Sequence, residues 1–146
     1  MLNVLLVFVG GGVGAVLRYL ASLGMAAALR GVTHDDAGIP REDATIGMVP
    51  WATFGVNVVG CLLIGLLIPV LTGPGEGGDH RMRLLLVVGV LGGFTTFSAF
   101  GHETMSLLQH GRTGIALGYV AASVVAGLAA VLLGQALAGN GSAPGG

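Results

Sequence analysis

The chain has 146 residues, of which 53% are hydrophobic and only 9% are charged, and its formal net charge is −1. A soluble globular domain averages about 25% charged residues, so this composition excludes a soluble domain and predicts one domain embedded in a membrane. The sequence has no lysine and no basic tract, which excludes a nucleic-acid-binding surface. Its single cysteine, Cys61, excludes an intrachain disulfide and a cysteine-rich metal site.

Four apolar segments are each long enough to cross a bilayer, which takes about 20 residues of helix. A polar stretch at 30–50 and a Gly-Pro-rich stretch at 73–81 separate the first three, and we expect both to be solvated loops. The sequence therefore predicts an all-α membrane protein with a single four-helix transmembrane domain over residues 1–138 and a disordered tail at 139–146. The expected helices cover about residues 2–29, 51–72, 82–109 and 113–138.

The first segment carries closely spaced glycines and one charge. Gly10 and Gly14 form a small-xxx-small pair, which indicates a seam where another helix packs closely. Arg18 lies deep in the same segment, where a charge costs at least ~2.5 kcal/mol to insert, so a functional position is the default hypothesis. We expect Arg18 at the mouth of a water-filled vestibule or at a buried helix contact; the alternative is a side chain that snorkels to the headgroups.

The second segment opens with Pro50 and Trp51, which favour a helix start and a membrane interface. Thr53 and Asn57 follow at i, i+4 spacing, which places their side chains on one face of the helix. Asn57 either bonds to a neighbouring helix or offers its NH2 donor to a passing solute. This segment alone favours neither alternative.

The third segment contains a stretch that is unusual for a spanning helix. Gly92 and Gly93 weaken a helix by roughly 1 kcal/mol each relative to alanine. Hydroxyl groups that compete for backbone partners follow at Thr95, Thr96 and Ser98. A backbone break at membrane depth is tolerated only where protein buries it or where it lines a wet cavity. We therefore expect a broken third helix near residues 92–96, and we expect the functional site of the chain at this break.

Further polar and aromatic residues follow this stretch. Phe97 and Phe100 are three residues apart and share one side of the helix. Glu103 is either a carboxylate of a pathway or a residue of a solvated vestibule, and we favour the vestibule. The fourth segment places Tyr119 and Ser123 on one face, where they form a polar track or are satisfied between helices.

The arginines are almost evenly shared between the two ends of the predicted bundle. Arg30, Arg41 and Arg112 lie on one side, and Arg81, Arg83 and the α-amino group lie on the other. An excess of Lys and Arg on one side normally sets the orientation of a membrane protein. Because this bias is nearly absent, the chain should insert either way round, and an antiparallel homodimer is the natural assembly.

These residues resemble the CrcB/Fluc family of fluoride ion channels, in order and along nearly the whole chain. The resemblance rests on Gly-Gly-x-Gly-Ala-x-x-Arg-Tyr (Gly11 to Tyr19), Thr-x-x-x-Asn-x-x-Gly (Thr53 to Gly60) and the highly specific Gly-Gly-Phe-Thr-Thr-Phe-Ser (Gly92 to Ser98). The chain departs from the family pattern at Ala99, where Thr is usual, at Gly127, where Ser is frequent, and in the length of the 30–50 stretch.

The resemblance implies a dual-topology, antiparallel homodimer in the cell membrane, with two pores that are each built by both subunits. It also implies a structural Na+ that is not transported and is held by the backbone carbonyls of Gly92 and Thr95. Ser98 adds a hydroxyl donor near the implied pore. The positions that match the family's ion pathway are Asn57, Phe97, Phe100, Tyr119, Ser123 and, in the first helix, Arg18.

The function that follows from this resemblance is passive, fluoride-selective efflux that keeps cytoplasmic fluoride low. One alternative is a small four-helix multidrug or cation exporter, which needs a carboxylate in the first span, whereas residues 2–29 contain no Asp or Glu. The other alternative is a non-transporting assembly subunit, which leaves the polar residues on all the spans unexplained. No nucleophile–base pair in the sequence suggests an enzyme.

Overall fold

The computed structural model describes residues 1–33, 42–72 and 79–140, and every regular element in these ranges is a helix. Four helical stretches are long and apolar enough to cross a membrane, at Leu2–Ala28, Trp51–Thr72, His80–Gln109 and Thr113–Gly139. These bounds fall close to the predicted ranges, and the predicted all-helical fold with four spans is confirmed. The elements are α1 (Leu2–Thr33), α2 (Glu42–Thr72), α3 (His80–Met82), η1 (Arg83–Leu91), α4 (Gly92–Phe94), α5 (Phe97–Gln109) and α6 (Thr113–Asn140).

The prediction of a solvated loop over 30–50 is wrong at both of its ends. Helix α1 continues to Thr33 and helix α2 begins at Glu42, well before Pro50, while residues 34–41 lie outside the described ranges. A polar sequence predicts exposure to solvent, but it does not distinguish an exposed helix from an exposed loop.

The other ends differ less from the expected ranges. Asp79 accepts hydrogen bonds from the Arg81 and Met82 amides through Oδ1, at 3.0 and 3.1 Å, so the third span begins at His80, within the predicted loop. Helix α6 continues to Asn140, so the predicted disordered tail is helical at its first two positions. The rest of that tail, 141–146, lies outside the described residues.

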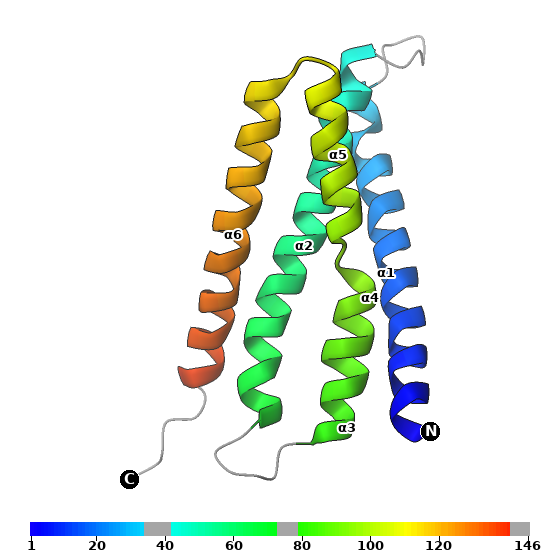
Figure 1. Ribbon diagram of the computed structural model, residues 1–146, viewed down its shortest axis with the longest axis vertical. Coiled ribbons are helices and arrows are strands. Elements are labelled where there is room, and N and C mark those ends of the chain that lie inside the picture. The colour runs from blue at the N-terminus through cyan, green and yellow to red at the C-terminus, as the bar shows by residue number, and fades with distance from the viewer. Residues whose placement is uncertain (34–41, 73–78, 141–146) are drawn as a thin grey trace.

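The helices run side by side along the long axis of the molecule (Figure 1). Helix α1 packs along η1 and α4, α2 packs along α6, and α5 lies against α2 and α6. The start of α1, the end of α2, α3 and the end of α6 lie at one end of the bundle. At the other end α5 turns into α6 through Gly111, whose φ of 73° suits a residue without Cβ.

Glycines bring α1 and the third span into backbone contact. A Cβ added to Gly10 would overlap the Leu85 carbonyl, and one added to Gly14 would overlap the Val90 carbonyl. From the opposite side, a Cβ on Gly89 would lie 2.9 Å from Gly10 Cα. Small residues let helix backbones approach closely in membranes. The predicted packing seam at Gly10 and Gly14 is therefore confirmed.

The third span changes its backbone conformation along its length. It is π-helical from Arg83 to Leu91, which the sequence did not predict, and α-helical from Gly92 to Phe94. Thr95 and Thr96 are extended, with φ and ψ of −76° and 158° and of −149° and 114°, and α5 begins at Phe97. π-helical segments are rare and frequently lie at functional sites.

The residues of the third span that leave the helical conformation therefore follow the glycine pair, rather than coinciding with it. Gly92 is helical, with φ of −63° and ψ of −36°, and Gly93 belongs to α4. Within the expected range of 92–96, the extended residues are thus Thr95 and Thr96, whereas the glycine pair keeps the helical conformation. A Cβ on Gly93 would overlap the Gly11 backbone, so this glycine serves close packing against α1 rather than flexibility.

Candidate functional site

Asn57 of α2 pairs with the backbone of the extended segment. Its Oδ1 accepts a hydrogen bond from the Thr96 amide at 2.9 Å, and its Nδ2 donates to the Thr96 carbonyl at 3.1 Å. A backbone N–H can only donate and a carbonyl can only accept, so this pair fixes which end of the Asn57 amide is which. Of the two alternatives that the sequence left open for Asn57, the structure shows the interhelical hydrogen bond. The second Nδ2 proton is not used in this pair.

Thr95 and Thr96 use their side chains to complete the backbone hydrogen bonding around the extended segment. The Thr95 amide and hydroxyl both donate to the Leu91 carbonyl, at 3.0 and 2.9 Å. Thr96 Oγ1 accepts from the Ala99 amide at 3.2 Å, so Thr96 caps the N-terminus of α5. Ser98 Oγ lies 3.3 Å from the same hydroxyl.

These bonds redirect two amides that a continuous α-helix would use differently. In such a helix, the Thr96 amide would donate to the Gly92 carbonyl and the Ala99 amide to the Thr95 carbonyl. Here the first amide donates to Asn57 Oδ1 and the second to Thr96 Oγ1. The Gly92 and Thr95 carbonyls therefore lose their helical donors, and their oxygens have lone pairs for another partner.

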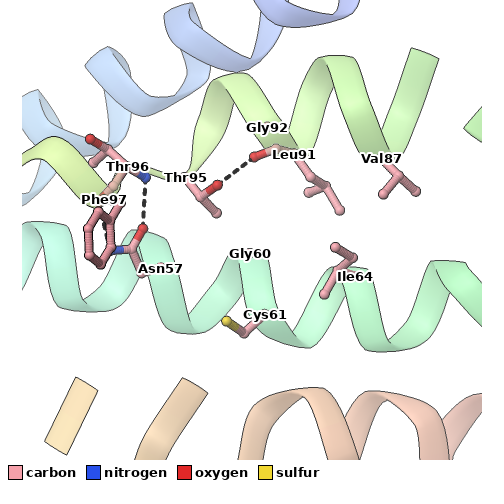
Figure 2. Close-up of a pocket in the computed structure, with 10 residues that line it drawn as sticks. All are labelled: Asn57, Gly60, Cys61, Ile64, Val87, Leu91, Gly92, Thr95, Thr96 and Phe97. Carbon is pink, nitrogen blue, oxygen red and sulfur yellow. Dashed lines mark hydrogen bonds between the residues drawn. The ribbon is translucent and has the colours of Figure 1, made fainter. Parts of the chain in front are cut away.

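A cavity of about 300 Å³ lies between α2 and the third span (Figure 2). The structure thus brings together four residues that the sequence placed in the site: Asn57, Gly92, Thr95 and Phe97. In Figure 2 the Asn57 side chain points to Thr96, beside the Phe97 ring. The complete lining is Asn57, Gly60, Cys61, Ile64, Val87, Leu91, Gly92, Thr95, Thr96 and Phe97.

Three aromatic rings continue from the edge of this cavity into the bundle. Phe97 is 84% exposed, so most of its ring has no neighbour in this chain. Its centroid lies 5.7 Å from that of Phe100, which in turn lies 5.2 Å from that of Tyr119. Phe97 and Phe100 thus lie together, as their spacing predicts. The Tyr119 hydroxyl is turned to Glu103, which corresponds to the interhelical alternative for this residue.

Glu103 is a buried carboxylate that joins three helices. Its Oε1 accepts from Thr53 Oγ1 of α2 at 2.5 Å, and its Oε2 accepts from the Tyr119 hydroxyl of α6 at 2.8 Å. Only 7% of Glu103 is exposed, so the expectation of a solvated vestibule is wrong. The sequence signalled a special position, because a carboxylate in a spanning helix is rare. It gave no sign of the two hydroxyl partners, which come from other helices.

Three further predicted residues, Ser123, Arg18 and Ser98, lie outside the cavity lining. Ser123 Oγ is buried and has no hydrogen-bond partner among the described residues. Arg18 is half-buried in α1, and the Ser22 hydroxyl donates to its backbone carbonyl at 3.0 Å. Ser98 is exposed at the start of α5. The structure of the single chain therefore does not gather all of the predicted pathway residues around one space.

The fold and the site define a small multi-pass membrane protein whose third span leaves the helical conformation beside a cavity with hydrogen-bond donors. The family model for "CrcB-like protein, Camphor Resistance (CrcB)" matches residues 5–135, and the chain belongs to this family. The resemblance inferred from the sequence motifs is thereby confirmed.

Curated relatives named "Fluoride-specific ion channel FluC" match most of the chain. The protein of Novosphingobium aromaticivorans is 46% identical over 131 residues, which cover 90% of this chain and 91% of the relative. The protein of Mesorhizobium japonicum is 41% identical over 138 residues, covering 94% and 97%. The protein of Agrobacterium fabrum is 41% identical over 140 residues, covering 96% and 98%. The chain is thus similar to these proteins over nearly its full length and theirs.

Proposed function

We propose that the chain is a fluoride-selective ion channel of the cell membrane, which lets fluoride leave passively and so keeps cytoplasmic fluoride low. The observation that carries this proposal is the match, at 41% identity or more over most of the chain, to relatives whose names describe fluoride-specific ion channels. Those names describe an ion channel rather than an enzyme. Fluoride enters acid-exposed cells as neutral HF and dissociates inside, so a passive route for the ion is sufficient.

The backbone of the third span supports a route for an anion. Because the helix stops at Phe94 and restarts at Phe97, the N-terminus of α5 lies within a membrane span. A helix N-terminus carries a partial positive charge, and transporters place such half-helix ends at anionic groups. The 13 residues of α5 are long enough to build up this dipole.

Neutral groups around the site suit a tightly hydrated anion that has to pass quickly. The free Nδ2 proton of Asn57 and the Ser98 hydroxyl are donors that replace water. The edges of Phe97 and Phe100 carry partial positive charge and meet an anion without holding it firmly. Conduction needs sites that are weak enough to leave. Ser123 Oγ, buried without a partner in the described chain, adds a further donor in α6.

An antiparallel homodimer completes the proposal. Phe97 is 84% exposed at the edge of a cavity that the single chain leaves open, so a second copy is needed to enclose an ion path. The nearly equal number of arginines at the two ends of the bundle supports insertion in both orientations. The interruption of the third span then serves two purposes, one in the ion path and one at the centre of the dimer.

A structural Na+ fits the carbonyls of the extended segment. Gly92 and Thr95 lose their helical donors there, and a hard cation prefers oxygen ligands such as backbone carbonyls. Within the described residues no cluster of three His, Cys, Asp or Glu side chains competes as a metal site. The cation would hold the backbones of two chains together and would not itself be transported.

The cation exporter is a weaker candidate. The carboxylate it would need is absent from the first span, and both oxygens of Glu103 in the third span are occupied by hydroxyl donors. A non-transporting subunit would leave the open cavity and the half-helix of α5 without a purpose. Fluoride efflux from liposomes carrying the purified chain tests the proposal. Rapid loss of fluoride supports it, and vesicles that retain fluoride as well as empty ones contradict it.

A further inference from the structure

One side chain, Asn57, contacts both the extended backbone and the cavity. Its Oδ1 holds the Thr96 amide at 2.9 Å, and its Nδ2 holds the Thr96 carbonyl at 3.1 Å. Without Asn57, the nearest ordinary acceptor for the Thr96 amide is the Gly92 carbonyl, four residues earlier in the helix. The Asn57 amide thus stands in the place of a helical carbonyl.

The same contacts prevent the amide from turning over. A flipped Asn57 would place NH2 against the Thr96 N–H and Oδ1 against the Thr96 carbonyl, which pairs donor with donor and acceptor with acceptor. The cavity therefore meets an asparagine whose remaining Nδ2 proton is available and whose orientation is fixed. A fixed donor suits an anion, whereas a freely turning amide would also offer its oxygen to a cation.

Neighbouring residues hold α2 in register with the third span. Thr53, one turn before Asn57, donates to Glu103 at 2.5 Å. One turn after Asn57, a Cβ on Gly60 would overlap Thr95 Cγ2, so only glycine leaves room for Thr95. Contacts on both sides thus fix the face of α2 that carries Asn57, and the position of Asn57 follows from theirs.

We propose that Asn57 is a positioning residue whose side-chain amide takes the Thr96 amide away from the Gly92 carbonyl, so that one side chain couples the fluoride path to the cation-binding carbonyl. This inference rests on the proposed function and deepens it. Asn57 contributes its Nδ2 proton to the path. Through Thr96 it also keeps the Gly92 carbonyl free for the cation.

The test compares purified full-length variants in detergent by hydrogen–deuterium exchange of the Thr96 amide. Asn57→Ala removes both bonds, whereas Asn57→Asp keeps an acceptor for the Thr96 amide but sets its second oxygen against the Thr96 carbonyl, which is also an acceptor. Val59→Ala is the matched control, because Val59 lies on the same helix and is 47% exposed. Asn57→Ala leaves the Thr96 amide only the Gly92 carbonyl as an acceptor, at the end of a helix that two glycines weaken, so we expect its exchange to rise by about fivefold or more. Exchange in Val59→Ala should stay near native, and exchange in Asn57→Asp should lie between that of Val59→Ala and that of Asn57→Ala.

Native exchange in Asn57→Ala would overturn the inference if this variant also keeps its full gain in melting temperature in Na+, because an amide that had moved to the Gly92 carbonyl would stay protected but would remove that gain. Exchange in Asn57→Asp as fast as in Asn57→Ala would also overturn it. If Asn57→Ala does not fold, Asn57→Ser takes its place, because its hydroxyl is too short to reach Thr96. Fluoride efflux should fall in both Asn57→Ala and Asn57→Asp, since both lack the NH2 donor. A role in the ion path alone cannot separate the two variants by exchange, so the separation supports positioning.

A second measurement tests the coupling to Gly92. We expect the native chain, Asn57→Asp and Val59→Ala to melt at a higher temperature in Na+ than in N-methyl-D-glucamine, and Asn57→Ala to lose most of this gain. A general loss of stability would lower both melting temperatures equally and leave the gain intact, which would contradict the coupling. A native chain that does not respond to Na+, or does not conduct fluoride, would refute those parts of the proposed function, and the exchange comparison still decides the role of Asn57.

Discussion

Removing the hydroxyl of Tyr119 tests how much its hydrogen bond to Glu103 contributes to the packing of α6 against α5. This hydroxyl donates to Glu103 Oε2 at 2.8 Å, and the Thr53 hydroxyl donates to the other carboxylate oxygen at 2.5 Å. The exposed fractions of Glu103, Tyr119 and Thr53 are only 7%, 8% and 8%, so solvent does not replace a lost donor. Tyr119→Phe removes one oxygen and keeps the ring that packs 5.2 Å from Phe100.

The expected cost follows from the burial of the acceptor. Removing one partner of a buried hydrogen bond costs about 1–3 kcal/mol, and the substitution leaves Glu103 with a single donor, so we expect Tyr119→Phe to lower the free energy of unfolding by about 2 kcal/mol. The assay is reversible unfolding in mixed detergent micelles, followed by circular dichroism. The control is Tyr19→Phe, because Tyr19 is 62% exposed on α1. Its cost should stay within about 0.5 kcal/mol.

A double-mutant cycle with Glu103→Ala isolates the interaction. In that background the Tyr119 hydroxyl has lost its acceptor, so Tyr119→Phe should cost almost nothing, which corresponds to a coupling energy of about 2 kcal/mol. Two results would refute the reasoning. One is a Tyr119→Phe cost no larger than that of Tyr19→Phe. The other is strict additivity of the two substitutions.

Three further predictions concern the path, the helix seam and the cation. Phe97→Ile should strongly reduce fluoride efflux from liposomes while the protein remains dimeric. The control Phe8→Ile, at a 76% exposed position of α1, should not reduce it. Equal efflux in both variants would show that Phe97 does not line the ion path. Gly93→Ala should lower the free energy of unfolding by about 1–3 kcal/mol because its Cβ overlaps the Gly11 backbone. Gly12→Ala faces open space and should gain up to about 1 kcal/mol, so matching costs would contradict the proposed packing. Replacing extracted Na+ with a larger cation should stop fluoride efflux, and unchanged efflux would argue against the carbonyl site.

The sequence predicted the parts of this fold that depend on composition and spacing. The membrane spans follow from apolar length, and the α1 seam follows from the spacing of Gly10 and Gly14. The shared face of Thr53 and Asn57 follows from helical periodicity, and both side chains do bond to the third span. Each of these features is set within a few neighbouring positions of one helix.

What the sequence could not predict depends on partners from other helices. The burial of Glu103 is set by Tyr119, 16 residues later, and by Thr53, 50 residues earlier. The helix leaves its regular conformation at Thr95 and Thr96 rather than at the glycines, because Asn57 supplies the replacement for a helical acceptor. Propensity identifies weak positions, but tertiary contacts decide which of them gives way.

Two departures from the family pattern also have a place in the structure. Gly127 is buried in α6, and a Cβ there would lie 3.4 Å from Cys61 Sγ, in ordinary van der Waals contact, so the fold leaves room for a Cβ at this position. Ala99 contributes its amide to the cap formed by Thr96 Oγ1, and this contact does not need a side-chain hydroxyl at position 99. Neither departure disturbs the hydrogen bonds between Asn57 and Thr96.

The most direct test of the central claim is the comparison of fluoride and chloride efflux from the same liposomes, loaded with both ions and carrying the purified chain. Ion-selective electrodes follow each anion, and an ionophore for the counter-cation prevents a limiting membrane potential. A fluoride-selective channel predicts rapid fluoride release while chloride stays inside until detergent is added. Chloride release as fast as fluoride release, or the release of neither ion, would contradict the account.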